Sequence, residues 1–252
     1  MEQTEKEKIK RLNCKFEPIY RKSTDCFYPI APPTHLARSS YPWESEAKLP
    51  RITRDFFRCK GSSLSLPLLN ENGPIADCNG CTRHGLPIIH GKEGVYPILI
   101  DLLNYIQKKT GKRVVITCGH RCPAHNTYAD SSKENRVSKH QIGAEVDFYV
   151  QGMEDRGQEI AGLLMQYYQE MPRYKNSKEY QDFKRYSKSD IAIAPWMNKE
   201  VVIKFFQKGE GRDGDNRHPH PYLSLQVRFD RDKKELVVYE WGKANLGFPR
   251  SH

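Results

Sequence analysis

Residues 138–150 read SKHQIGAEVDFYV and join a pair of candidate metal ligands to the start of a strand. The end of this stretch, AEVDFYV, has the alternating and β-prone composition of a buried strand. His140 and Asp147 lie on either side of Gly143, and a glycine lets the chain fold back over the strand that follows. Zinc binds both imidazole nitrogen and carboxylate oxygen. The stretch therefore indicates either an ordinary loop before a strand or two metal ligands held at the edge of a sheet.

The segments around this stretch predict an α+β fold. Helical spacing of apolar residues predicts two amphipathic helices, at 95–111 and 155–171. Predicted strands follow at 113–119, 144–150, 222–229 and 235–241, and the last two form a hairpin around the charged turn DRDKK. Residues 172–190 are polar and predict a loop or a weak helix. The order helix, strand, strand, helix, strand, strand predicts a small, mainly antiparallel sheet with helices packed on one face.

The N-terminal part of the chain has a different composition. The segment YPIAPPTHLARSSYPWESEAKLP, 28–50, is rich in Pro, Ser and aromatic residues and shows no sustained period. A segment of this length cannot bury a core of its own. We therefore expect residues 1–52 to form an irregular N-terminal arm and residues 53–252 to form the main domain.

Composition narrows the class of protein. The chain has 41 basic and 31 acidic residues, and its net charge of +10 favours anionic partners. The basic residues are scattered and match no nucleic-acid motif, so we interpret the charge as a solvated surface and do not expect nucleic acid as a partner. No window is apolar enough to span a bilayer. The charged start, MEQTEKEKIKRLNCKFEP, lacks the apolar region of a secretory signal, which predicts a cytoplasmic protein.

A third metal ligand can come from a second histidine segment. Residues 212–226 read RDGDNRHPHPYLSLQ, with His218 and His220 directly before a predicted strand. Side chains two residues apart share a face in extended backbone. Both imidazoles can therefore point toward the site of His140 and Asp147.

These segments together carry a resemblance to a known family. The segment SKHQIGAEVDF resembles the signature Ser-x-His-x-x-Gly-x-Ala-x-Asp of the zinc D-alanyl-D-alanine carboxypeptidase family. That family includes vancomycin-resistance dipeptidases and phage cell-wall endopeptidases, and the hedgehog signalling domain shares its fold. VVITCGHRCPAHN is similar to the family segment Ser-Gly-Tyr-Arg…His-Asn, and HPH is similar to a His-x-His whose second histidine binds zinc. The resemblance runs from about Phe56 to Phe229, with its motifs in the family order.

The resemblance implies a zinc peptidase with named site residues. His140, Asp147 and His220 would bind zinc, and a zinc-bound water would attack a peptide carbonyl. Arg121 would contact the substrate or polarise its carbonyl, and His218 would hydrogen-bond the tetrahedral intermediate. The implied substrates are small peptidoglycan peptides of the cell wall, cleaved by a D-Ala-D-Ala-type carboxypeptidase. Such a substrate implies a periplasmic or secreted protein, in contrast to the cytoplasmic location that the missing signal predicts.

The chain departs from the family at three positions in these motifs. Glu145 stands where the family has alanine, and period-2 alternation puts it on the same face as Asp147. Glu145 is therefore either catalytic, a support for the ligands, or the partner of an ion pair with Arg121 or a lysine. Cys118 replaces a serine and His120 replaces an aromatic residue, which changes the lining of the site.

The general base is a separate question. Relatives often place a glutamate shortly before the final histidine, and this chain has Glu210, Asp213 and Asp215 in that region. Asp215 is our candidate for the base. The alternative is that GEGRDGDN is a polar turn or a calcium-binding type of acidic loop.

The cysteines suggest a second metal site. Seven cysteines are an odd number, so at least one lies outside any intramolecular disulfide set, and reduced thiols or metal ligands are favoured. Cys59, Cys78, Cys81 and Cys122 can form a closed structural zinc site, and His84 can replace one of them. The alternatives are buried free thiols or a disulfide in an oxidising compartment.

Three functions remain open at this point. The first is a zinc peptidase with one catalytic zinc and a second, structural zinc. The second is a non-catalytic, metal-containing binding module of the same fold. The third is a basic nucleic-acid-binding protein with a structural zinc site.

Overall fold

The computed structural model describes residues 49–61, 67–70, 73–78, 85–89, 92–129, 137–187, 191–210, 220–240, 242 and 244. The chain divides into two units, Met1–Pro50 and Arg51–His252. All helices and strands below belong to the second unit. The predicted N-terminal arm lies outside the described residues, apart from its last positions.

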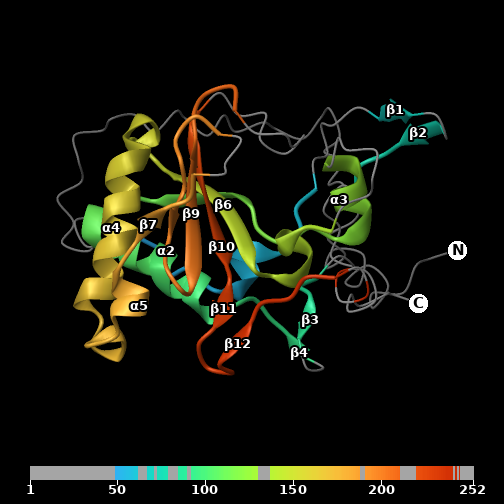
Figure 1. The fold of residues 1–252 in the computed structure, drawn as a ribbon. Coiled ribbons are helices and arrows are strands. Elements are labelled where there is room, and N and C mark those ends of the chain that lie inside the picture. The colour runs from blue at the N-terminus through green and yellow to red at the C-terminus, as the bar shows by residue number, and fades with distance from the viewer. Residues whose placement is uncertain are drawn as a thin grey trace, which may run out of the picture. The chain divides into compact units, whose positions relative to one another are not determined.

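A six-stranded antiparallel sheet forms the centre of the second unit (Figure 1). In spatial order its strands are β5 (Val114–Cys118), β6 (Glu145–Val150), β10 (Tyr222–Val227), β9 (Val201–Phe206), β8 (Trp196–Met197) and β7 (Lys184–Arg185). Every neighbouring pair is antiparallel. The predicted α+β class with a mainly antiparallel sheet is therefore confirmed.

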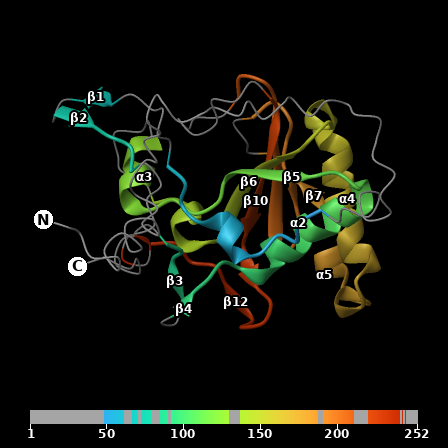
Figure 2. The same cartoon turned by 180° about the vertical axis from the view of Figure 1, so that it is seen from behind.

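Two long helices cover one face of this sheet. They are α2 (Pro97–Thr110) and α4 (Gly157–Glu170), which contact each other. α2 packs against β5 and β10, and α4 packs against β9 and β10; Figure 2 shows α2 in front of the sheet. The C-cap of α2 is Gly111, whose φ of 63° is left-handed, as expected for a helix that ends on glycine. Both predicted helices are confirmed.

Shorter helical segments connect these elements. They are η1 (Arg54–Phe57), α3 (Pro123–Ala129), η2 (Lys139–Ile142), η3 (Glu154–Arg156), η4 (Pro172–Tyr174) and α5 (Lys178–Gln181). Among the described residues, none of the helices has the length and apolar character that crossing a membrane requires.

Alternation along the central strands separates an apolar face from a polar one. Val146 and Phe148 of β6 pair with Leu225 and Leu223 of β10, and all four are buried in the core. The residues between them, including Asp147, point to the opposite face because side chains alternate along a strand. The core therefore lies between the sheet and the two long helices, and the polar face lies on the other side.

Three small hairpins lie outside the main sheet. They pair β1 (Leu68–Asn70) with β2 (Gly73–Ile75), β3 (Ile88–Ile89) with β4 (Lys92–Glu93), and β11 (Phe229–Asp230) with β12 (Glu235–Leu236). The predicted pairing of 222–229 with 235–241 was wrong for most of its length, since β10 pairs with β6 and β9 instead. The missed partner, β9, reads VVIKFF and alternates between buried and half-buried positions.

A close backbone approach fixes the loop after β5. A Cβ atom at Gly119 would lie 2.6 Å from Phe57 Cα and 2.7 Å from Phe57 O, so only glycine fits without a shift of backbone. The next residue, His120, donates its backbone N–H to Phe57 O at 2.6 Å. The loop that begins at Gly119 is therefore packed directly on η1.

We expect Gly119→Ala to lower the free energy of unfolding by about 1–3 kcal/mol, because the added methyl group must displace backbone. Gly162→Ala is the matched control, because a Cβ at Gly162 in α4 meets no atom within 4 Å. Alanine favours the helix there, so the control should raise stability by up to about 1 kcal/mol. Urea unfolding of both variants measures the difference, and equal shifts would contradict the close approach.

Candidate metal centre

A capped 3-10 turn positions His140. The Ser138 hydroxyl accepts a hydrogen bond from His140 N at 3.3 Å, and Ser138 N donates to Gln141 Oε1 at 2.9 Å. This reciprocal capping box satisfies the first backbone donors of the turn. Gly143 ends the turn with a left-handed φ of 69° and returns the chain to β6. The fold-back that the sequence predicted at this glycine is confirmed.

The imidazole of His140 has a defined orientation. Its Nδ1 lies 2.7 Å from the backbone carbonyl oxygen of Gly119, which can only accept, so Nδ1 carries the hydrogen. The other nitrogen, Nε2, faces two carboxylates, at 3.5 Å from Asp147 Oδ2 and 3.7 Å from Glu145 Oε2. A metal-binding histidine commonly donates its second ring N–H to a carbonyl in this way.

A β-bulge brings Cys118 into the same cluster. Ile116 is opposite Phe148, but Cys118 is opposite Asp147, so one extra residue sits in β5. A regular ladder would place Thr117 opposite Asp147 and turn Cys118 toward the core. Because of the bulge, one donor atom each of Cys118, His140 and Asp147 lies within 4.8 Å of the others. These three buried residues can hold a metal ion.

Glu145 is held next to this cluster by two hydrogen bonds. Ser224 Oγ donates to Glu145 Oε1 at 2.8 Å, and Gln226 Nε2 donates to the same oxygen at 2.6 Å. Within the described residues, the ion pair of Glu145 is with His140, and not with Arg121 or a lysine as one interpretation of the sequence had it. The carboxylate therefore belongs to the candidate metal centre.

The electrostatic field of the cluster favours a cation. Burial alone would lower the pKa of His140, but Cys118, Glu145 and Asp147 outweigh burial and raise this pKa well above its usual range. Burial would raise the pKa of Asp147, but its interactions with His140 and with Arg121 lower it. The same negative groups that stabilise an imidazolium would stabilise a metal ion, which competes with that proton.

Arg121 lies at the edge of the cluster. Its side chain is buried, and its Nε donates to Cys118 Sγ at 3.2 Å. His120, beside it, bonds through Nδ1 to the His140 carbonyl oxygen at 2.9 Å, so it fixes the turn. The structure thus places Arg121 beside Cys118, while its contact with a substrate stays a prediction.

The structure does not bring His220 to this centre. Ser224 is the residue opposite Asp147, and His220 precedes it by four residues, about 13 Å along an extended strand. His220 is exposed, and its ring lies 5.6 Å from that of Tyr149. The sequence predicted the face of the strand to which His220 belongs but not its distance from Asp147 along the sheet. The third donor beside His140 and Asp147 is Cys118, and not His220.

Several predicted residues lie outside the described part of the chain. They are His218, Asp213, Asp215, Cys81 and His84. Glu210 is described and has a structural role, since its carboxylate accepts hydrogen bonds from the backbone N–H groups of Ala192 and Gln207, each at 2.8 Å.

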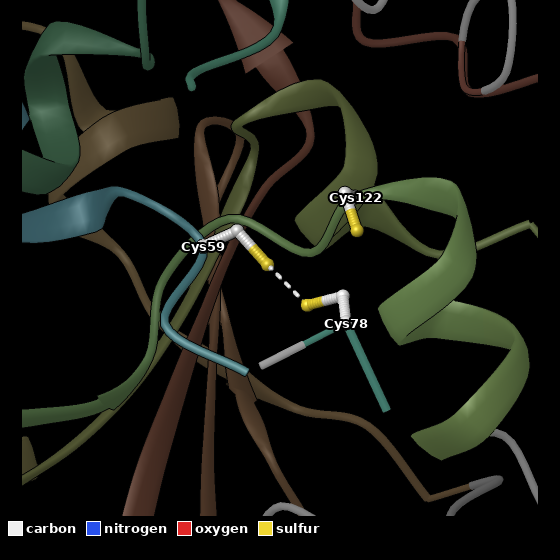
Figure 3. Close-up of side chains that lie close together, drawn as sticks. All are labelled: Cys59, Cys78 and Cys122. Carbon is white, nitrogen blue, oxygen red and sulfur yellow. Dashed lines mark hydrogen bonds between the residues drawn. The ribbon is translucent and has the colours of Figure 1, made fainter. Parts of the chain in front are cut away.

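A second cluster contains three of the four predicted cysteines. Cys59, Cys78 and Cys122 have one sulfur atom each within 4.8 Å of the others, and Figure 3 shows the three thiols pointing toward one another. Cys59 Sγ also lies 3.3 Å from Nδ1 of His125, a residue that sequence reasoning missed. The spacing Cys-Pro-Ala-His at 122–125 was the available signal. This group can also hold a metal ion.

Comparison with known proteins does not assign the chain to a family. No family model matches the sequence, and neither the curated proteins nor the solved structures give a match. The resemblance to the D-alanyl-D-alanine carboxypeptidases therefore stays a prediction from motifs.

The two candidate third ligands give a direct test of this centre. We expect Cys118→Ser to weaken zinc binding at this site by at least about 100-fold, since even supporting residues cost 10–100-fold. His220→Ala should leave the affinity unchanged. Competition with a zinc chelator measures both affinities, and the opposite ranking would restore His220 as the ligand.

Proposed function

We propose that this protein is a zinc-dependent hydrolase that cleaves a peptide amide bond, with Cys118, His140 and Asp147 as the protein ligands. One observation carries the proposal: Nε2 of His140 faces the carboxylates of Asp147 and Glu145 at 3.5 and 3.7 Å, while Nδ1 is held by the Gly119 carbonyl and lies 3.5 Å from Cys118 Sγ. This is the arrangement in which imidazole binds a metal and a nearby carboxylate can transfer a proton.

The donor set fits zinc. It combines a thiol, an imidazole and a carboxylate, the three types of side chain that zinc binds in proteins. Three protein ligands leave a fourth position open, which distinguishes catalytic from structural sites. When bound, zinc supplies Lewis-acid activation of a carbonyl and of water.

Glu145 takes the role of general base in this proposal. Its Oε1 accepts hydrogen bonds from Ser224 and Gln226, which hold the carboxylate in place. Its Oε2 is on the side of His140, and so of the ligand cluster. A base held this way can accept a proton from water and deliver it to the leaving amine. Glu145 takes this role, which the sequence assigned to Asp215, because its carboxylate lies 3.7 Å from His140 Nε2.

Arg121 would bind the substrate. Its Nε donates to Cys118 at the edge of the ligand cluster, and a planar guanidinium is a group that recognises a carbonyl or a carboxylate. The motif resemblance points to small peptidoglycan peptides, with a D-Ala-D-Ala-type bond as the substrate. The same motifs suggest a fold of the D-alanyl-D-alanine carboxypeptidase and hedgehog type, with which the antiparallel sheet is compatible.

Hydrolysis of D-Ala-D-Ala and of purified muropeptides tests this function. We expect zinc-loaded wild type to release products, and Glu145→Gln to lower kcat by about 10²–10⁴-fold while zinc stays bound. Glu154→Gln is the matched control, because that carboxylate accepts a hydrogen bond from Gly152 N and is outside the cluster. Amine release and metal content are measured on the same samples.

A non-catalytic binding module is the second candidate. Its support is the near-complete burial of the ligands, since the exposed fractions are 2% for His140 and 3% for Asp147. A thiolate ligand also makes zinc a weaker Lewis acid by donating more charge. Zinc bound at His140 with no turnover of any peptide would favour this candidate, and absence of zinc at His140 would remove both.

A further inference from the structure

Potential metal ligands from three distant segments meet beside the Arg121 loop. Cys59, which follows η1, Cys78, which follows β2, and Cys122, which directly precedes α3, form one group; Cys78 also forms a second group with Asp77 and with His125 of α3. Figure 3 shows the sulfur atoms of Cys59, Cys78 and Cys122 directed toward a common centre. Cys59, Cys122 and His125 are buried, and Cys78 is partly exposed. No part of the proposed hydrolase chemistry uses these residues.

The separations match those between the ligands of a tetrahedral zinc ion. Zinc–sulfur bonds of about 2.3 Å at the tetrahedral angle place two sulfurs roughly 3.8 Å apart, and a sulfur and an imidazole nitrogen roughly 3.5 Å apart. The Cys59 and Cys78 sulfurs are 3.6 Å apart, and Cys59 Sγ is 3.3 Å from His125 Nδ1. A disulfide requires about 2.05 Å, so the 3.6 Å between the Cys59 and Cys78 sulfurs is not that of a disulfide bond.

Hydrogen bonds from the backbone support two of these ligands. His125 N donates to Cys122 Sγ at 3.3 Å, which orients the thiol. Cys78 N donates to Asp77 Oδ1 at 2.6 Å, which fixes the backbone that carries Cys78. Such supporting contacts around ligands are typical of built metal sites.

We propose that Cys59, Cys78, Cys122 and His125 bind a structural zinc ion that ties the Arg121 loop to the segments before β1 and after β2. Four protein ligands close the coordination sphere, so this ion would have no open position for a substrate. The fourth ligand is His125, whose Nδ1 lies 3.3 Å from Cys59 Sγ; the Cys81 and His84 that the sequence suggested lie outside the described residues. The inference does not rest on the proposed hydrolase function.

The proposed ion would stabilise the loop that also positions the His140 imidazole. Cys122 directly follows Arg121, and the same loop contains Gly119, whose carbonyl oxygen orients the His140 imidazole. The described chain on the far side of the cluster has little secondary structure, with two- and three-residue strands from 68 to 93. A metal ion can hold such segments together without the large buried apolar surface that a hydrophobic core needs.

Cobalt substitution tests the site, because the intensity of sulfur-to-cobalt charge-transfer absorption increases with the number of thiolate ligands. We expect a strong band and a tightly bound ion in wild type, and the loss of about one metal equivalent per chain in Cys78→Ser and His125→Ala. His220→Ala, an exposed histidine, is the control and should keep full metal. His140→Ala should keep the strong band, which separates this site from the proposed catalytic one.

Three outcomes would overturn the inference. Cys78→Ser with unchanged metal and charge-transfer absorption would show that these thiols are not ligands. Metal-free wild type lighter by the mass of two hydrogens would show a disulfide. Loss of the ion in Cys81→Ser with full retention in His125→Ala would replace His125 as the fourth ligand. If a variant fails to fold, thiol labelling of wild type followed by peptide mapping decides: a chelator should make Cys59, Cys78 and Cys122 reactive, and no change at these three thiols would contradict the site.

Discussion

The alternation of side chains along β6 is the constraint on which both the core and the candidate site depend. Val146 and Phe148 enter the core, and Glu145 and Asp147 enter the polar cluster. Because the period is two residues, a slip of one position would bury the carboxylates among apolar side chains and expose the core residues. β6 is paired on both sides, with β5 and β10, so its register is fixed from two directions. Burial of Val146 and Phe148 therefore also determines that Glu145 and Asp147 point to the polar face of the sheet.

The polar cluster depends on the loop after β5 as much as on the sheet. The Gly119 carbonyl oxygen accepts from His140, His120 bonds to the backbone of the same turn, and Arg121 donates to Cys118. These contacts come from four consecutive residues whose path is limited by the close approach of Gly119 to Phe57. Charged groups that are buried need partners whose positions do not relax, because rearrangement in a low-dielectric site is costly. The loop and the turn at His140 provide such partners for each other.

Periodicity predicted the elements that have one clear face. Both long helices and the strands β5, β6 and β10 follow from their apolar spacing and their ends. The pairing of those strands was not predictable in the same way. A charged turn at 230–234 suggested that 222–229 pairs with 235–241, but pairing with β9 buries Ile203 and Phe205, which outweighs the local turn signal. The motif predicted that His140 and Asp147 lie in one site. His220 lies outside this site because of the register between β6 and β10, which no local sequence pattern specifies.

The bulge in β5 makes the pairing of a short segment as important as its composition. Between Ile116 and the start of the loop, one extra residue decides whether the thiol or the hydroxyl of the preceding threonine faces Asp147. If the same five residues paired without the bulge, Thr117 would lie opposite Asp147, Cys118 would turn toward the core, and every following position of the loop would move by one step. The segment therefore tolerates changes of side chain at its half-buried positions far better than a change that removes the bulge. Two chains with the same residues here but different strand pairing would present different chemistry on the same sheet.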